Sequence, residues 1–339
     1  MSTSGQIDQQ LKQFDADFEA LRREIGRVIV GQEEVIEGLL MAMVAGGHVL
    51  LEGLPGLGKT RLVRALAAAV DLSFQRIQCT PDLMPADVIG TYVVMETPQG
   101  RRTFEFQKGP LFANLVLADQ VNRTTPKTQS ALLEAMDEES ITVSTETFRL
   151  PRPYLVVATQ NPLEMEGTYP LPEAQIDRFF FKLVVGRPSC EQMEQILDRT
   201  TEAEQVKPRA VVDGSRILEM GQLIRMVPVA DEIRRWAVSL VAATHPDSEL
   251  APEIVRQYVH YGSSPRGAQA MILGAKARAI LDGRYHVSSE DLRAVAPWAL
   301  RHRLILNFRG QADESIQPDA IIATVLQSIP EPTAAGAPS

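Results

Sequence analysis

The segment GLPGLGKT at residues 53–60 constrains the fold of this chain more than any other feature. It fits the pattern G-x-x-x-x-G-K-[ST] at each fixed position, and it lies between the apolar run HVLLE and the helical pattern TRLVRALAAAVD. Such a loop points backbone N–H groups at a phosphate, and the helix N-terminus adds partial positive charge. Lys59 is expected to reach the β- and γ-phosphates, and Thr60 to ligate Mg²⁺. The sequence therefore predicts an α/β fold that binds a nucleotide.

Five short apolar runs predict the strands of a parallel sheet. They are rich in β-branched or aromatic residues and apolar nearly throughout, which is typical of parallel strands covered on both faces. Helical patterns such as PKTQSALLEAMDEE separate them, which indicates a doubly wound α/β layer. The runs are HVLLE (48–52), FQRIQC (74–79), NLVLAD (114–119), YLVVAT (154–159) and FFFKLVV (179–185).

After Arg187 and Pro188 the pattern becomes one helix after another, which predicts a small all-helical second domain. Ser264-Pro265 opens one helix and Ser288 with Asp291 opens the next, because these residues satisfy helix N-termini. The helices are expected around 190–205, 214–226, 231–244, 266–282 and 289–300. The predicted segments are a helical, partly flexible N-terminus at 1–24, an α/β domain at 25–187, a helical lid at 188–310, and a C-terminal segment at 311–339 with a disordered end.

Composition disfavours several classes of protein. With 34 basic and 43 acidic residues, the net charge of −9 argues against general polyanion binding. The longest apolar stretches, such as 35–49, are interrupted, so no membrane span of about 18 or more apolar residues is expected. The polar start MSTSGQIDQQ has no signal-peptide pattern, which predicts a cytoplasmic protein.

Cysteine and histidine usage gives no sign of a metal centre or a disulfide. Cys79 and Cys190 are far apart in the sequence and are expected to be buried, reduced thiols. The five histidines show no ligand spacing, so the only metal expected is one that accompanies the nucleotide.

Asp119 ends an apolar run, where a strand can deliver a carboxylate to Mg²⁺ beside the phosphate loop. Gln120 follows, at the position where an ATPase of this pattern carries Glu to activate water. A glutamine can accept a hydrogen bond but cannot take up a proton, and general bases contribute about 10²- to 10⁴-fold. Nucleotide binding should therefore survive while turnover drops. Glu164 and Glu166 are the nearest alternative bases in the sequence.

Three more polar residues are candidates for the site. Asn161 follows the run YLVVAT, where an amide can orient water, although Asn-Pro also marks turns. Arg178 stands just before the last predicted strand. Arg266 lies in the first turn of a helix, where a cation opposes the helix dipole, so it is expected to face an anion. Pairing with a surface carboxylate is the alternative for Arg266.

With these residues in view, the chain resembles the MoxR-type AAA+ ATPases from about Ile25 to Asn307. The resemblance implies a P-loop AAA+ core followed by a small helical lid. It also implies a homo-oligomeric ring, usually a hexamer, with ATP and Mg²⁺ bound between subunits. The matching segments are IVGQ, GLPGLGKT, KGPLFANLVLAD, NRTTPKTQSALLEAMDE, ATQNPLEMEGTYPLPEAQIDRF, SPRGAQ and RHRLILNF.

The resemblance also implies a role for each site residue. Asn161 would be sensor 1, Arg178 the arginine finger offered to the neighbouring subunit, and Arg266 sensor 2 on the lid. Residues 81–110 would hold an insert and residues 141–153 a hairpin, both on the central face of the ring. The nucleotide-binding residues would be Val30, Gly31, Gln32, Gly53, Leu54, Pro55, Gly56, Leu57, Gly58, Lys59, Thr60, Leu62 and Arg266, with Thr60 and Asp119 on the metal.

Members of the family resemble chaperones that remodel or mature a protein client, often beside a partner with a von Willebrand factor A domain. Gln120 leaves two interpretations open. It is either a substitution that traps the ATP-bound form of a hydrolysing ATPase, which the retained Asn161, Arg178 and Arg266 favour, or the mark of a non-hydrolysing scaffold that uses ATP for assembly. A nucleic-acid-associated AAA+ motor is a third hypothesis, which the acidic charge balance disfavours.

Overall fold

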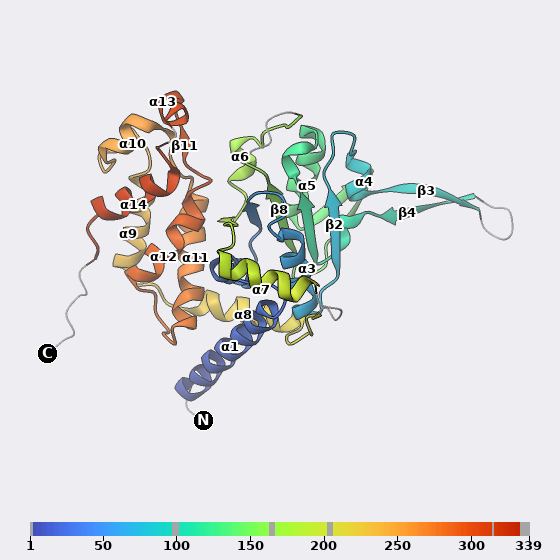
Figure 1. The fold of residues 1–339 in the computed structure, drawn as a ribbon, viewed down its shortest axis with the longest axis horizontal. Coiled ribbons are helices and arrows are strands. Elements are labelled where there is room, and N and C mark those ends of the chain that lie inside the picture. The colour runs from blue at the N-terminus through green and yellow to red at the C-terminus, as the bar shows by residue number, and fades with distance from the viewer. Residues whose placement is uncertain (1–2, 97–101, 163–166, 202–205, 314, 333–339) are drawn as a thin grey trace. The chain divides into compact units, whose positions relative to one another are not determined.

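The computed structural model describes residues 3–96, 102–162, 167–201, 206–313 and 315–332 (Figure 1). The chain folds into two compact units. The sheet unit comprises Glu19–Arg178 and Leu183–Leu218, and the helical unit comprises Met1–Phe18, Phe179–Lys182 and Glu219–Ser339. The domain boundaries expected from the sequence stay predictions.

One five-stranded sheet organises the sheet unit, in the order β2-β5-β8-β1-β9 (Figure 1). The pairings β2 with β5, β5 with β8 and β1 with β8 are parallel. The carboxyl ends of these strands therefore meet at one edge of the sheet, where ligands of open α/β folds bind. The strands are β1 (Val49–Glu52), β2 (Phe74–Gln78), β5 (Leu115–Asp119), β8 (Leu155–Gln160) and β9 (Phe181–Val184).

Burial differs between the central and edge strands. Every residue of β5 is buried, as expected for a strand covered on both faces. The same expectation is wrong for β2, an edge strand in which only Ile77 is buried and Gln75, Arg76 and Gln78 are exposed. Because an edge strand has a neighbour on one side only, polar side chains on it remain accessible to solvent and to a ligand.

The helices of the sheet unit follow apolar periodicity. In α3 the buried residues Leu62, Val63, Leu66, Ala69 and Val70 recur at helical spacing and form one apolar face. The helices are α2 (Glu33–Ala45), α3 (Lys59–Val70), α4 (Pro85–Ile89), α5 (Pro126–Glu138), α6 (Glu173–Ile176) and α7 (Cys190–Thr201), with short 3₁₀ turns at Pro110–Phe112 and Val121–Arg123.

Two antiparallel hairpins occupy parts of the segments that the sequence predicts as an insert and a hairpin, at residues 90–108 and 140–149. Strands β3 (Gly90–Glu96) and β4 (Arg102–Lys108) form the first, which projects from the sheet unit in Figure 1. Strands β6 (Ser140–Val143) and β7 (Glu146–Arg149) form the second. The Phe106 ring stacks on the Phe148 ring at 4.6 Å between centroids, and the Tyr92 hydroxyl donates to Glu146 at 2.9 Å. These contacts join the hairpins to each other, while their place in a ring stays a prediction.

The helical unit contains the helices expected after residue 226 and three that the sequence did not indicate. Ser264 accepts a hydrogen bond from the Arg266 N–H, and Ser288 with Asp291 forms a capping box, so both predicted helix starts are confirmed. The unexpected helices are α10, α13 and α14. The unit contains α9 (Asp231–Ala242), α10 (Glu253–Tyr258), α11 (Pro265–Leu281), α12 (Ser289–Leu300), α13 (Phe308–Ala312), α14 (Pro318–Ser328), and the hairpin of β10 (Val259–Tyr261) and β11 (Ile305–Leu306).

Two further helices have residues in both units. They are α1 (Thr3–Gly26), which begins the described chain, and α8 (Gly214–Met226). The end of the C-terminal segment, for which disorder is predicted, lies mostly outside the described residues. Within the described ranges, no helix has the length and apolarity that crossing a membrane requires.

The two cysteines differ in exposure. Cys79 is buried and Cys190 is exposed, and both are free thiols. Burial, with a smaller contribution from the charge of Asp119, raises the pKa of the Cys79 thiol to about 12. The expectation of a buried thiol is therefore wrong for Cys190, which begins α7, a helix with no buried residue.

His48 is expected to make stability depend on pH. Its Nδ1 accepts the Val156 N–H at 3.0 Å, so Nε2 carries the proton and donates to the Met136 carbonyl at 3.0 Å. Burial lowers the pKa of His48. His302, in the helical unit, also has a lowered pKa, because it is buried and lies near the positive charge of Arg303. Near pH 6.5 and below, the unfolded state therefore binds more protons than the folded state. We expect each histidine to reduce the free energy of unfolding by up to about 1.4 kcal/mol per pH unit as the pH falls.

Urea unfolding at pH values between about 7.5 and 5.5 measures this effect. This range lies above the pKa of most carboxyl groups, about 4, so histidines dominate the change. The variant His48→Gln should show a shallower loss of stability with falling pH than the parent. The matched control is His260→Gln, because His260 is exposed. An equal pH slope in His48→Gln and the parent would contradict the assignment.

Candidate functional site

The loop at residues 53–58 connects β1 to α3, as the sequence pattern predicts. Gly56 and Gly58 have φ values of +83° and +79°, in the left-handed region that favours glycine. At Gly53, a Cβ atom would lie 3.0 Å from the Val185 carbonyl oxygen, so a side chain there would crowd the loop. Glycine at these positions is therefore required by backbone geometry.

Lys59 is the first residue of α3, and its ammonium group curls back onto the loop. Its Nζ donates to the Gly53 carbonyl at 2.6 Å and to the Leu54 carbonyl at 2.8 Å. These bonds hold a positive charge beside a helix N-terminus, which also favours an anion. The loop is thus preorganised for a phosphate group.

Two cavities open beside this loop within the sheet unit. We call the first, of about 410 Å³, the phosphate cavity. It brings together predicted catalytic and metal residues that end or follow strands β5 and β8. The second, of about 680 Å³, is the base cavity. The phosphate cavity is lined by Pro55, Gly56, Leu57, Gly58, Lys59, Thr60, Arg61, Arg76, Asp119, Gln120, Thr159, Gln160 and Asn161. The base cavity is lined by Val28, Ile29, Val30, Gln32, Leu54, Pro55, Gly56, Leu57, Gly58, Arg61, Leu62, Val185, Arg187, Pro188, Met193, Ile196, Arg199 and Thr200.

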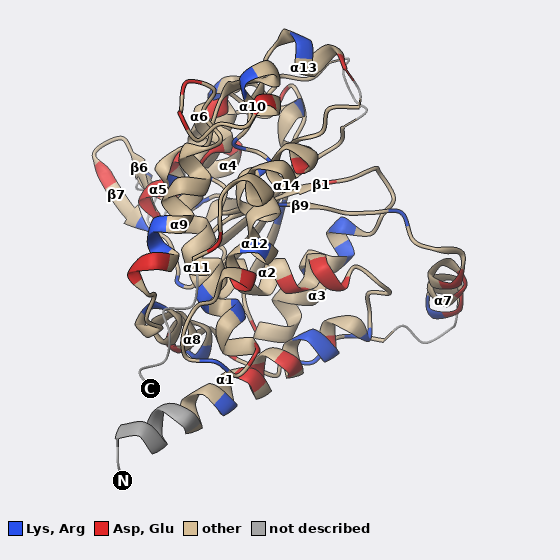
Figure 2. Ribbon diagram, turned by 90° about the vertical axis from the view of Figure 1, so that its left-hand side faces the viewer, with Lys and Arg blue, Asp and Glu red and all other residues tan. Residues whose placement is uncertain are grey.

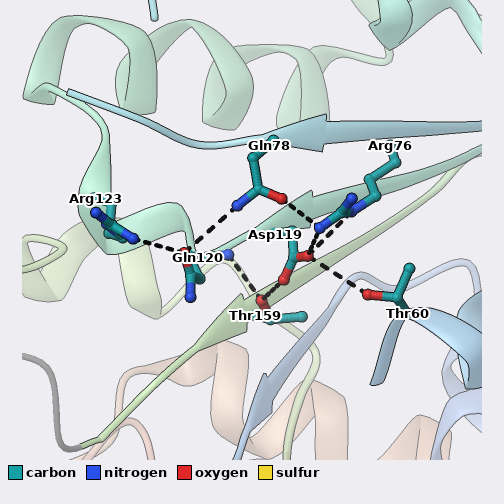
Figure 3. A network of polar contacts seen from close by, with 7 residues as sticks. All are labelled: Thr60, Arg76, Gln78, Asp119, Gln120, Arg123 and Thr159. Carbon is teal, nitrogen blue, oxygen red and sulfur yellow. Dashed lines mark hydrogen bonds and ion pairs between the residues drawn. The ribbon is translucent and has the colours of Figure 1, made fainter. Parts of the chain in front are cut away.

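Thr60 and Asp119 converge in the phosphate cavity. The Thr60 hydroxyl lies 3.5 Å from Asp119 Oδ2, and the Thr159 hydroxyl donates to Asp119 Oδ1 at 2.7 Å (Figure 3). A hydroxyl and a carboxylate beside a phosphate-binding loop are the oxygen ligands that Mg²⁺ prefers. The residues therefore fit the metal that the sequence predicts there.

Arg76 belongs to this cluster, although its role was not predicted from the sequence. Its Nε and Nη2 both donate to Asp119 Oδ2, at 3.1 and 2.6 Å (Figure 3). Gln78, two residues further along β2, accepts another bond from the Arg76 Nη2. The signal was present in FQRIQC, since three polar residues are unusual in a strand assigned as buried.

Gln120 lies at the end of β5 with φ +60°. Its N–H donates to the Thr159 hydroxyl at 2.8 Å, which fixes the backbone. Its Oε1 accepts from Arg123 Nη1 at 3.2 Å and lies 3.5 Å from Gln78 Nε2 (Figure 3). The Gln120 side chain, which lines the phosphate cavity, is therefore held by donor groups.

Asn161 follows β8 and is buried, with 7% of its surface exposed, in the wall of the phosphate cavity. Its neighbour Gln160 lines the same cavity, and the Gln160 carbonyl accepts the Gly53 N–H at 3.2 Å. The end of β8 is thereby bound to the start of the loop. Glu164 and Glu166, the alternative bases, lie outside the described residues.

The base cavity contains several of the residues predicted to bind the nucleotide. Val30, Gln32 and Leu62 line it. Gln32 has φ +63° and donates from Nε2 to the Gly186 carbonyl at 2.8 Å. A Cβ atom at Gly31 would come within 2.5 Å of the Gln192 amide nitrogen, so Gly31 permits the approach of α7.

Arg178 lies outside both cavities. Its Nη1 donates to the Leu133 carbonyl at 3.0 Å and pairs with Asp137 at 2.9 Å. It lines a separate hollow of about 280 Å³ on α5 and α6, which shares no lining residue with the phosphate cavity. The structure thus does not bring Arg178 to the phosphate cavity of its own subunit.

Arg266 belongs to the helical unit, in the first turn of α11. Its backbone N–H donates to Ser264 Oγ at 3.1 Å, and its side chain is exposed. Its role toward a phosphate stays a prediction.

Both units of the chain match known proteins. Residues 48–181 match the ATPase family associated with various cellular activities (AAA), and residues 251–325 match the AAA lid domain. The Chaperone MoxR1 of Mycobacterium tuberculosis is 42% identical over 315 residues, which cover 91% of this chain and 81% of that protein. Protein MoxR of Methylorubrum extorquens is 32% identical over 330 residues, which cover 91% of this chain and 94% of that protein.

The fold agrees with these similarities. The crystal structure of a candidate ATPase from Cytophaga hutchinsonii has a TM-score of 0.88 and 40% identity, and the match covers 96% of this chain and 98% of that chain. The predicted architecture of a parallel α/β core and a helical lid is confirmed. The chain is a member of the MoxR-type AAA+ ATPases.

Proposed function

We propose that this chain binds Mg²⁺-ATP between the subunits of a homo-oligomeric ring and uses ATP binding and slow hydrolysis for chaperone-like remodelling of a protein client. One observation carries the proposal. The phosphate cavity brings Lys59, Thr60, Asp119, Gln120 and Asn161 together from α3, β5 and β8. These are the side-chain types that ATP binding and turnover need.

Each residue has a separate task in this proposal. Lys59 and the loop N–H groups bind the phosphates, while Val30, Gln32 and Leu62 enclose the base. Thr60 and Asp119 would hold Mg²⁺, which when bound neutralises phosphate charge. Asn161 would orient the attacking water. Gln120 accepts a hydrogen bond but cannot take the proton, so turnover is slow.

The ring is supported by the location of Arg178. Since it lies outside the phosphate cavity of its own subunit, its guanidinium would serve the ATP of a neighbouring subunit. To do so it would leave Asp137, an exchange that the negative charge of a neighbouring phosphate favours. A hexamer is the expected ring. Arg266 would sense the γ-phosphate from the lid, so that ATP closes the lid over the base, and the lid would comprise residues 188–310.

The client and the partner are proposed from the relatives. The name Chaperone MoxR1 supports a protein client for this chain. A partner with a von Willebrand factor A domain and a location in the cytoplasm are further predictions from the sequence.

Gln120 favours a second candidate function, a scaffold that binds ATP for assembly without hydrolysing it. Measured turnover of the parent chain distinguishes the two functions. Charge gives no support to a nucleic-acid motor, because the net charge is −9 and helices such as α1 and α7 carry acidic as well as basic residues (Figure 2).

Lys59→Ala is expected to weaken nucleotide binding at least about 30-fold, since truncating one partner of a charge-assisted contact to phosphate costs several kcal/mol. Titration with a fluorescent ADP measures it, and light scattering with and without ATP measures assembly. The control is Lys127→Ala, which removes the same charge from an exposed position on α5. If the parent binds no nucleotide, or Lys59→Ala binds as well as the parent, the proposal is wrong.

A further inference from the structure

Both oxygens of Asp119 make polar contacts in the phosphate cavity. Arg76 donates to Asp119 Oδ2 from two nitrogens, at 3.1 and 2.6 Å, and the Thr60 hydroxyl faces the same oxygen at 3.5 Å (Figure 3). The other oxygen, Oδ1, accepts from Thr159. Both oxygens of the proposed metal carboxylate therefore have partners within the chain.

The location of Arg76 allows it to leave this contact. It lies on the edge strand β2, and 39% of its side chain is exposed, while Asp119 is 13% exposed. Gln78 accepts from the same guanidinium, so Arg76 is held by an amide and a carboxylate. A long side chain on an edge strand can rotate toward solvent without disturbing the buried sheet.

Arg76 and Mg²⁺ would act on the same carboxylate. A magnesium ion needs its oxygen ligands at about 2.0–2.1 Å in near-octahedral geometry. Asp119 Oδ2 already accepts two hydrogen bonds from Arg76, so it is less available as a ligand for Mg²⁺. In addition, the guanidinium and Mg²⁺ are both positively charged and repel each other at short range. Arg76 therefore disfavours the binding of Mg²⁺ to Asp119.

We propose that Arg76 is an internal counter-ion of Asp119 that competes with Mg²⁺, so that the metal enters the nucleotide site only when Arg76 moves away. The inference rests on the proposed nucleotide site and adds a residue that sets its demand for Mg²⁺. Arg76 is a positioning residue in this account, because it acts on the metal through Asp119.

Two opposite effects follow from removing the guanidinium. In Arg76→Gln, Asp119 keeps its full negative charge, so nucleotide without Mg²⁺ meets more repulsion and binds more weakly. The same carboxylate is then open to Mg²⁺, so less metal is needed to restore binding. Since the ion pair is partly exposed, each effect is expected to be about fivefold.

The test is a titration of parent and variants with N-methylanthraniloyl-ADP at Mg²⁺ concentrations from zero, in EDTA, to saturation. Arg76→Gln should lower the Mg²⁺ midpoint about fivefold and weaken binding in EDTA by a similar factor. Arg76→Lys keeps the positive charge but loses the planar guanidinium that donates two hydrogen bonds. Its Mg²⁺ midpoint should therefore lie between those of the parent and Arg76→Gln. The control is Arg64→Gln, because Arg64 is exposed on α3 and contacts the Phe74 ring instead of Asp119.

A second readout uses Mg²⁺ alone, without nucleotide. Mg²⁺ should raise the melting temperature of Arg76→Gln more than that of the parent, because binding to the folded state stabilises it. An unchanged Mg²⁺ midpoint overturns the inference. So does an equal loss of affinity at every Mg²⁺ concentration, which would make Arg76 a phosphate ligand. Absence of nucleotide binding by the parent would instead contradict the proposed function.

Discussion

Replacing Gln120 with glutamate is expected to raise the rate of ATP hydrolysis by at least about 100-fold, with little change in ATP affinity. Glutamate restores a proton acceptor at the end of β5, and general bases contribute about 10²- to 10⁴-fold. The phosphate-binding residues Lys59 and Thr60 are not altered, so the affinity for the ground state should be kept.

The geometry around position 120 supports this expectation. The backbone conformation is fixed by the bond from the Gln120 N–H to the Thr159 hydroxyl. Glutamate has nearly the same shape, so its carboxylate would accept the Arg123 hydrogen bond that Gln120 Oε1 accepts at 3.2 Å. A nearby cation favours the ionised form of a carboxyl group, which is the form that accepts a proton.

Steady-state turnover of the parent, Gln120→Glu and Gln120→Ala measures the effect. The alanine variant is the control, because it removes the amide without adding a carboxylate, and it should gain nothing. If the parent already turns over as fast as Gln120→Glu, Gln120 does not impair hydrolysis. An unchanged slow rate in Gln120→Glu would mean that another group acts as the base.

Arg178→Ala, introduced into Gln120→Glu, is expected to lower the rate by about 10³- to 10⁵-fold, which is the usual contribution of an arginine finger. The affinity for ATP should change little, because the finger stabilises charge that develops only in the transition state. Arg152→Ala is the matched control, since Arg152 forms an exposed ion pair with Glu139 at the end of the same helix, α5.

A mixing experiment determines whether Arg178 acts on a neighbouring subunit. A chain with Arg178→Ala retains an intact phosphate cavity, and a chain with Lys59→Ala retains the finger. Both carry Gln120→Glu, and each alone should be inactive. Mixed rings should recover activity at interfaces where the first type supplies the cavity and the second the finger. If mixing recovers nothing although mixed rings form, the action of Arg178 across the interface is excluded.

Local sequence signals were sufficient for the phosphate loop and for the central strands. Gly56 and Gly58 adopt positive φ values that glycine permits, and the apolar runs around β5 and β8 form strands buried nearly throughout. Asp119 and Asn161 follow or end these strands, so the parallel order of the sheet brought them to one edge. These features depend on residues near one another in the sequence or on strand periodicity.

Other features depend on position in the sheet. The run FQRIQC gives a strand, but its place at the edge of the sheet exposes Arg76 and Gln78 and brings Arg76 to Asp119, 43 residues away in the sequence. Cys190 is exposed at the start of α7, a helix that buries none of its residues. Helix α14 (Pro318–Ser328) buries Ile321, Ile322, Val325 and Leu326, although its segment was expected only to end in disorder.

The sequence by itself thus determined the phosphate loop, the class of fold, the family resemblance and the departure at Gln120, because each of these is encoded in a contiguous motif or in apolar periodicity. The tertiary structure alone decided that Arg76 shares an oxygen of Asp119 and that Arg178 pairs with Asp137, outside the phosphate cavity of its own subunit. Contacts of this kind join segments far apart in the sequence. They depend on which strand lies at the edge of the sheet and on how α5 and α6 meet, and no local pattern of residues specifies that.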